Sequence, residues 1–349
     1  MPGRSGQTGG RGYHRRDVSH ALLLLASLVV ILAGCELFVN AIEWLGERLH
    51  LDDGATGSLL AAVGTAMPET LIPIIAIVFS NERDSDQVGI GAIVGAPFLL
   101  ATLAFAVVAT AVVSFAATGR RTRAISADRR VMGRDLAFFL TGFSAAMVLG
   151  VVDAPAGVKI AAAVGLLGMY GVYVWRTLKG DAASGEALKP LYFHRRAVRP
   201  GTVQIVAQCV AGLGLIIVGA HLFVQGVSGV SDQLGVPTLA LSLLIAPLAT
   251  ELPEKFNSVF WVRDRKDTLA LGNITGAMVF QSTIPVCVGL ALTDWDLDRY
   301  AVVSGVLALV SGAIVWLGLR MRDAVTWPVL ALGLPFYLAF VGYVIVEVA

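Results

Sequence analysis

The chain has little charge for its length. Charged residues make up 15% of its 349 residues and hydrophobic residues 56%, whereas soluble domains carry about 25% charged residues. Apolar runs near the ~20 residues that cross a bilayer recur along the whole sequence. The composition therefore predicts an all-α integral membrane protein, with the lipid bilayer as the main surrounding of the chain.

Other absences exclude several classes of function. The formal net charge is only +1, with no basic domain to neutralise phosphates, so nucleic acid is not an expected partner. The sequence shows no Ser/His/Asp set, HExxH motif or phosphate-binding loop, so we expect neither an enzyme nor a bound cofactor. Cys35, Cys209 and Cys287 lie inside apolar runs without metal-ligand or disulfide spacing, which favours small buried side chains.

Ten apolar segments are separated by polar ones. The longest polar stretch, 179–200, is rich in glycine, proline and charge, and we interpret it as a linker between a first repeat, 19–178, and a second repeat, 201–349. Residues 1–18 combine small residues with arginines, which is typical of a disordered tail. The predicted spans are approximately 19–45, 54–80, 87–116, 135–152, 156–178, 201–227, 236–262, 268–292, 299–319 and 325–348.

Basic residues are unevenly distributed between the loops, and this predicts the orientation of the chain. Six arginines lie in 117–134 and six basic residues in 176–200. With ten spans, these loops fall on one side, together with the basic loops that follow the seventh and ninth spans. We therefore expect a multi-pass protein of the plasma membrane with a cytoplasmic central loop and both termini outside, although the four arginines of the N-terminal tail oppose this orientation.

The two halves carry an internal repeat. Three matches occur in order at nearly constant offset, which indicates duplication. Five spans, an odd number, separate equivalent helices, so the second half must enter the membrane inverted, as in many secondary transporters. The matched segments are GCELFVNA (34–41) with GAHLFVQG (219–226), TAMPE (65–69) with TELPE (250–254), and GAIVGA (91–96) with GNITGA (272–277).

The N-terminal segment permits another interpretation. Basic residues, an apolar stretch and LAGC at 32–35 resemble a lipoprotein signal, which requires the N-terminus inside. Cys35 lies within the repeated helix, however, so the repeat favours a transmembrane segment.

The repeated Pro-Glu pair predicts a site. Pro68 and Pro253 lack an N–H, so the carbonyl four residues earlier loses its helical partner. Such carbonyls are tolerated at membrane depth only where protein or a hydrated cavity meets them. Glu69 and Glu254 follow the prolines, and a lone charge at the bilayer centre costs at least ~2.5–3.5 kcal/mol. Two such charges at equivalent positions indicate a shared partner.

We expect that partner to be a cation. Carboxylates, threonine hydroxyls and free carbonyls are hard oxygen ligands that suit Ca²⁺ or Na⁺. Thr65 and Thr250 lie one helical turn before Glu69 and Glu254, on the same face. The alternative is a static bundle in which both glutamates are protonated and hydrogen-bonded.

These motifs resemble those of a known family. GTAMPE (64–69) and ATELPE (249–254) resemble the two α-repeat signatures of the sodium/calcium exchanger family, within the cation/Ca²⁺ antiporter superfamily. The resemblance spans nearly the whole chain and implies ten helices, two inverted halves and exchange of Ca²⁺ against Na⁺, H⁺ or K⁺ by alternating access. It also implies that Glu69 and Glu254 are central cation ligands, with Thr65 and Thr250 beside them.

The chain departs from the family pattern, GTSLPE followed by GNxxGSNxxN. The serine of the first motif is Ala66 in one half and Glu251 in the other. The last polar residue of the second motif is Leu100 in one half and Gln281 in the other. The site thus offers fewer oxygens than the about six to eight that Ca²⁺ takes. Glu251 and Gln281 complete our set of candidate ligands.

The predicted function is therefore a cation antiporter, with Ca²⁺ exchanged against Na⁺ or H⁺ as the first choice. One alternative is a proton-coupled exchanger of another cation, which the missing ligands favour. Another is a non-transporting membrane protein that kept the exchanger fold, which the eroded second motif favours.

Glu251 and Lys255 have no counterparts in the first half. They are four residues apart and share a face on a continuous helix, in the favourable order for an ion pair. A buried lysine is costly alone, so we expect the two to pair. The alternative is that Lys255 extends to an aqueous surface.

Overall fold

The computed structural model describes residues 10–48, 67–80, 84–152, 154–178, 189–194, 200–322 and 324–348. Within these ranges the chain is helical, with one isolated β-bridge. Eight helices of this part are long and apolar enough to cross a membrane, and two shorter apolar helices, Glu69–Phe79 and Thr238–Glu251, fall in two further predicted spans. The predicted all-helical membrane fold is confirmed.

The described residues of the first half form five helical segments. They are α1 (Gly10–Arg48), α3 (Met67–Phe79), a long segment built of α4 (Ser85–Leu99), the π-helix η1 (Leu100–Ala104) and α5 (Phe105–Ala117), then α6 (Arg129–Val151) and α7 (Ala156–Leu178).

Two of these helices begin earlier than the hydropathy indicates. α1 starts at Gly10, so helix covers part of the stretch that we assigned to a tail, while residues 1–9 lie outside the described residues. α6 starts at Arg129 because Asp128 caps it, its carboxylate accepting hydrogen bonds from the N–H groups of Arg130 and Val131.

The second half repeats this order. Its helices are α8 (Thr202–Leu234), α9 (Thr238–Arg263), α10 (Asp267–Gln281) followed by α11 (Ile284–Leu292), α12 (Arg299–Arg322), and α13 (Trp327–Ala331) followed by α14 (Gly333–Val348). α8 is longer than its predicted span and ends at Leu234. The next residue, Gly235, has a φ of 66°, the left-handed conformation common after helix ends.

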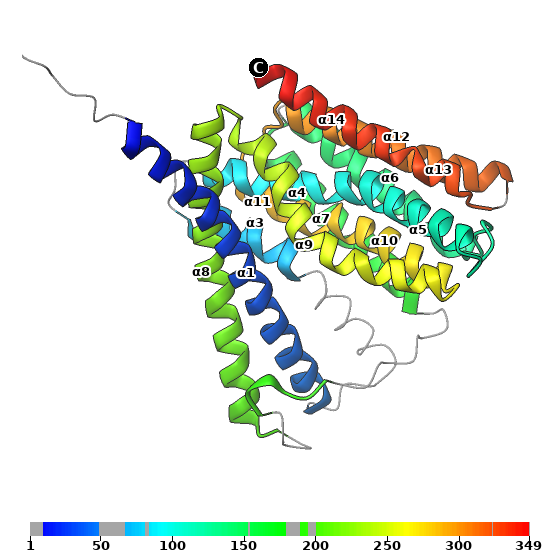
Figure 1. The fold of residues 1–349 in the computed structure, drawn as a ribbon, viewed down its shortest axis with the longest axis horizontal. Helices are drawn as coiled ribbons and strands as arrows, with labels where there is room; N and C mark the ends of the chain where they lie inside the picture. The colour runs from blue at the N-terminus through cyan, green and yellow to red at the C-terminus, as the bar shows by residue number, and fades with distance from the viewer. Residues whose placement is uncertain are drawn as a thin grey trace, which may run out of the picture.

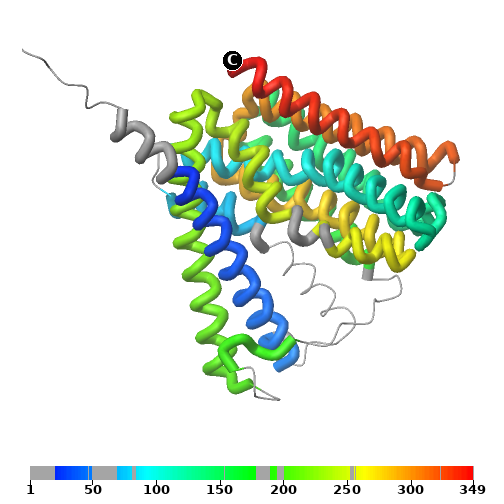
Figure 2. Tube along the Cα trace, viewed as in Figure 1, coloured from blue at the N-terminus to red at the C-terminus, as the bar shows by residue number. Residues whose placement is uncertain are grey.

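The helices α1 and α8 pack along each other and lean away from the remaining helices (Figure 1 and Figure 2). Glycines let their backbones touch: a Cβ on Gly212 would lie 2.7 Å from the nitrogen of Phe38, and one on Gly226 2.9 Å from the Cα of Leu24. Gly34 and Gly219, which the repeat aligns, lie in the same interface. The equivalent first helices of the two halves are thus partners in the fold.

The described part of the linker closes one end of this pair. It contains the 3₁₀ turn η2 (Tyr192–His194), and Leu191 is fully buried against Ala41 and Ile205. Gln208 on α8 donates a hydrogen bond of 2.9 Å to the Asn40 side chain on α1. The remainder of the predicted linker lies outside the described residues, and the domain boundaries stay a prediction.

The other helices form a bundle in which α4 lies against α9 (Figure 1). Their backbones touch at Gly91 and Gly95, where a Cβ would lie 2.6 Å from the Leu239 carbonyl oxygen and 2.2 Å from that of Leu243. Both α4 and its equivalent α10 end in irregular backbone. η1 follows α4, and a turn at Ser282 and Thr283 separates α10 from α11. Such local departures from α-helix often mark functional sites.

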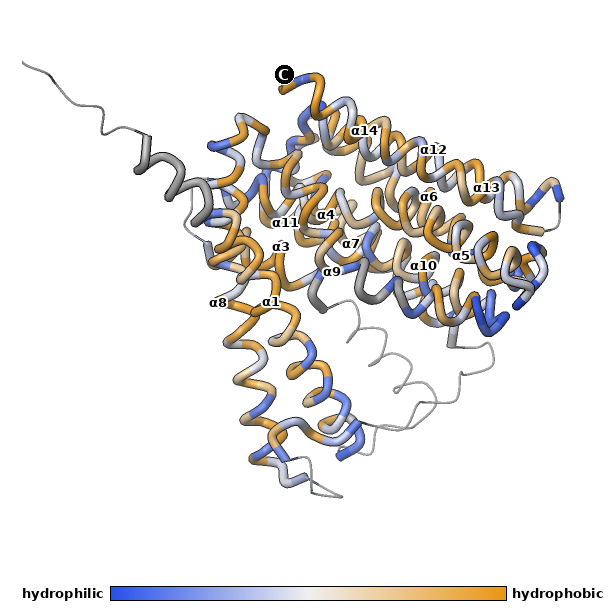
Figure 3. Tube along the Cα trace, viewed as in Figure 1, coloured by the Kyte–Doolittle hydropathy of each residue, from blue (hydrophilic) through white to orange (hydrophobic). Residues whose placement is uncertain are grey.

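Apolar side chains cover much of the outside of the bundle. Figure 3 shows hydrophobic residues along the helices and hydrophilic ones gathered near the helix ends. Val164 on α7 and Leu338 on α14 are 63% and 57% exposed. This surface is what a lipid surrounding requires, so the chain is a multi-pass membrane protein.

Candidate cation-binding site

Residues from the two halves meet at a small buried cavity between α3, α4 and α9. Glu69 in the first turn of α3 is 5% exposed, and Thr250 on α9 is 3% exposed. The cavity measures about 10 Å³, roughly enough for one water-sized species. Its walls are formed by Glu69, Ile72, Ala92, Ala96, Ala246, Pro247 and Thr250. Two predicted ligands, one from each half, therefore line the same cavity.

The cavity wall on α9 contains a proline that the sequence analysis did not use. Pro247 has no N–H, so the carbonyl of Leu243 lacks its helical donor, as we argued for the two repeated prolines. The Thr250 hydroxyl donates to the Ala246 carbonyl at 3.2 Å, which leaves its oxygen lone pairs available. In the sequence, a second proline six residues before Pro253 indicated this further free carbonyl.

The other two predicted ligands belong to a polar cluster between α9 and α10. Gln281 donates from Nε2 to Oε1 of Glu251 at 3.0 Å. Lys255 Nζ lies 3.3 Å from Oε2 of Glu251 and donates to Oδ1 of Asn273 at 3.1 Å. The predicted contact between Glu251 and Lys255 is confirmed. Lys255 is 1% exposed, which excludes the alternative that it extends to an aqueous surface.

One oxygen of this cluster is available to a ligand. Oε1 of Gln281 is buried and accepts no hydrogen bond from any described residue. Buried polar groups in proteins are nearly always partnered, so such an oxygen is a candidate cation ligand.

Two predicted ligands, Thr65 and Glu254, are not among the side chains that the structure describes. Thr65 lies outside the described residues, and the structure describes Glu254 only as part of the α9 backbone. Among the described side chains, no group of three or more His, Cys, Asp and Glu gathers as a metal site. The roles of Thr65, Glu254 and the other candidate ligands stay predictions.

The sequence analysis did not identify a buried carboxylate that contacts α10. Asp135 on α6 is 1% exposed and accepts hydrogen bonds from Thr275 on α10 at 2.8 Å and from Arg134 at 3.0 Å. Thr275 lies on α10, the helix whose Asn273 accepts a hydrogen bond from Lys255 of α9, so this contact ties α6 of the first half to α10. The available signal was a carboxylate at the first residue of the span predicted at 135–152, because ionisable residues within membrane spans are functional candidates by default.

Comparisons with known proteins agree with this arrangement. Residues 19–179 and 205–346 match the family model described as sodium/calcium exchanger protein. The chain is 24% identical to the putative antiporter CaxA of Alkalimonas amylolytica, over 92% of this chain and 96% of that protein. It is 22% identical to an uncharacterised membrane protein of Methanocaldococcus jannaschii, over 73% of this chain and 76% of that protein.

Solved structures show the same fold. The H⁺/Ca²⁺ exchanger CAX has a TM-score of 0.72 at 16% identity, covering 94% of this chain and 83% of that one. The sodium-calcium exchanger NCX_Mj has a TM-score of 0.54 at 19% identity, covering 94% of this chain and 98% of that one. The ten-helix, two-repeat fold is therefore confirmed. Since the family match covers most of the sequence and falls in both halves, the chain belongs to the sodium/calcium exchanger protein family.

Proposed function

We propose that this protein is a secondary-active cation antiporter that exchanges Ca²⁺ against Na⁺ or H⁺ by alternating access. The observation that carries the proposal is the cavity that Glu69 from the first half shares with Thr250 from the second. A site between two repeats can open to either side when one repeat moves against the other. A carboxylate beside a hydroxyl in a water-sized cavity suits a hard cation.

The geometry of the second cluster bears on the coupling ion. Lys255 neutralises Glu251 and so withdraws one carboxylate from the ligand set. Binding several Na⁺ ions needs more anionic ligands than this site offers. Coupling to H⁺, or exchange of a cation other than Ca²⁺, needs fewer. The Glu251–Lys255 pair therefore favours coupling to H⁺. It also supports a second candidate function, proton-coupled exchange of a cation other than Ca²⁺.

Uptake of radiolabelled Ca²⁺ into proteoliposomes tests the proposal. We expect accumulation against the Ca²⁺ gradient when an outward Na⁺ or an outward H⁺ gradient is imposed in separate trials, and none in protein-free liposomes. Accumulation of another cation with no Ca²⁺ flux would favour the second candidate. The absence of flux of any tested cation under both gradients would contradict antiport and favour a non-transporting protein.

The orientation is a separate proposal, motivated by the basic loops: the central linker lies in the cytoplasm and both termini outside. In a background without the native cysteines, a cysteine at Ser184, in the linker, should resist membrane-impermeant thiol reagents in intact cells. A cysteine at Asp296, exposed between α11 and α12, should react with them. The opposite labelling pattern would reverse the orientation.

A further inference from the structure

A cavity at the basic end of the bundle has the chemistry of an anion site. It lies where the loop after α5 meets the connection between α12 and α13, and its volume is about 400 Å³. Arg123 from the first half and Arg322 from the second line it, together with Trp327. Both arginines are exposed, so their guanidinium groups are open to a ligand.

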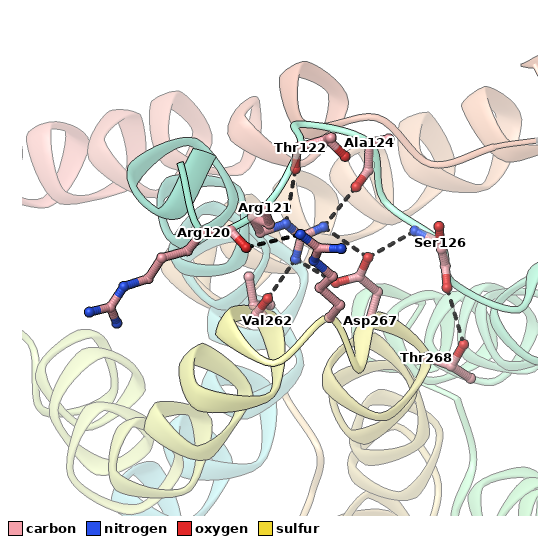
Figure 4. Close-up of polar contacts among 9 residues, drawn as sticks. Arg120, Arg121, Thr122, Ala124, Ser126, Val262, Asp267 and Thr268 are labelled. Atoms are coloured by element: carbon pink, nitrogen blue, oxygen red, sulfur yellow. Dashed lines mark hydrogen bonds and ion pairs between the residues drawn. The ribbon is translucent and has the colours of Figure 1, made fainter. Parts of the chain in front are cut away.

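The loop that carries Arg123 is held in place by a buried ion pair, shown in Figure 4. Arg121 bonds both carboxylate oxygens of Asp267 on α10, at 2.7 and 2.9 Å, and also donates to the carbonyl oxygens of Val262 and Ala124. The N–H of Ser126 donates to the same carboxylate at 2.8 Å. The first wall of the cavity is therefore preorganised, which lowers the entropic cost of binding.

The second wall is joined to the first. Ala124 forms a β-bridge with Thr326, and the Arg123 guanidinium lies 5.9 Å from the centre of the Trp327 ring. Thr326 itself lines the cavity. The β-bridge and the arginine–tryptophan contact therefore hold the two walls of the cavity together.

The cavity lies at the level where two apolar spans end. Arg322 is the last residue of the span Arg299–Arg322, and Trp327 is the first of the span Trp327–Val348. Tryptophan is enriched at this membrane–water boundary. Further along the same connected helices, Leu317 and Leu332 are 52% and 44% exposed, which gives acyl chains an apolar surface to follow.

We propose that this cavity binds the phosphate of an anionic phospholipid. A single guanidinium can donate two parallel N–H bonds to phosphate oxygens, and basic pockets between transmembrane helices hold anionic headgroups. The position at the boundary and the adjacent apolar surface favour a lipid over free phosphate. Of the acidic residues nearby in sequence, Asp128 is engaged in capping α6, and Asp323 lies outside the described residues. The headgroup would connect the two halves of the protein.

Lipid titration followed by native mass spectrometry tests this site, with the whole protein purified in a neutral detergent. Wild-type protein should bind phosphatidylglycerol in preference to phosphatidylcholine. The double variant Arg123→Gln with Arg322→Gln should weaken the apparent affinity for phosphatidylglycerol by about twenty-fivefold, which is about fivefold for each arginine near an anionic surface.

The matched control is Arg120→Gln with Arg130→Gln, which removes the same charge from exposed positions outside the cavity. In Figure 4 the Arg120 side chain points away from the cluster around Asp267. The control should keep the wild-type preference. Equal losses in both double variants would show a diffuse surface-charge effect, and an unchanged cavity variant would show that lipid binds elsewhere. Either result overturns the proposal, as would inorganic phosphate binding as tightly as the lipid.

Discussion

Replacing Glu69 by glutamine is expected to abolish cation exchange while leaving insertion and folding intact. The side chain is 5% exposed and lines the cavity that it shares with Thr250. Glutamine keeps the volume but removes the charge that attracts a cation, which should lower the apparent cation affinity on the order of a hundredfold or more in a buried site. Transport of radiolabelled cation into proteoliposomes under the gradient that drives the wild-type protein measures the effect.

The control makes the same chemical change at an exposed position. Glu347→Gln on α14 removes a carboxylate that pairs with Arg299 and is 33% exposed. This variant should transport at the wild-type rate, and both variants should elute as single species with similar thermal stability. By the repeat, Glu254→Gln should behave as Glu69→Gln does. Normal transport by the Glu69 variant in a well-folded preparation would remove that residue from the site.

The helices could be predicted from the sequence because hydropathy and duplication are local signals. Apolar runs of sufficient length marked the spans, and the repeat required α1 and α8 to be equivalent. The breaks were not predictable in the same way. The apolar sequence continues through η1 at Leu100–Ala104, and the turn after Gln281 interrupts a segment that hydropathy treats as one span. Backbone irregularity of this kind depends on contacts with neighbouring helices.

The candidate site was predictable only where the repeat pointed to it. Glu69, Thr250, Glu251 and Gln281 were selected from the motif, and the structure buries all four. The contact between Asp135 and Thr275 joins residues 140 positions apart, and no local pattern reports such a pairing. The same holds for Arg121 and Asp267, whose ion pair fixes the loop after α5. These contacts depend on how the two halves pack against each other.

Replacing Lys255 by methionine should change the pH dependence or the cation selectivity of transport. In the wild-type protein the ammonium lies 3.3 Å from the Glu251 carboxylate, and both side chains are 1% exposed. Methionine has a similar length and no charge, so it leaves Glu251 as an uncompensated buried anion. Removing one partner of a buried pair costs about 3–5 kcal/mol. Binding a proton or a transported cation to the freed Glu251 carboxylate would offset this loss of stability. Either event should shift the pH dependence or the cation selectivity of exchange.

A second substitution separates this electrostatic effect from loss of packing. In Glu251→Gln with Lys255→Met, no unpaired charge remains, so stability and transport should both be closer to wild type than in the single Lys255 variant. Lys159→Met is the matched control, because Lys159 is also buried but donates to the Asp294 carbonyl away from the site. That control should lose stability without a change in selectivity.

The measurements are thermal stability of each variant and transport rate against pH for a set of competing cations. If Lys255→Met keeps the wild-type rate, pH profile and selectivity, the pair has no part in ion binding and serves only to join α9 to α10. If the shift occurs and the double variant reverses it, the ammonium acts as a fixed cation within the site. One carboxylate would then be neutralised in every state of the transport cycle, and fewer mobile cations would be needed to balance the charge that Glu69 and its counterpart carry.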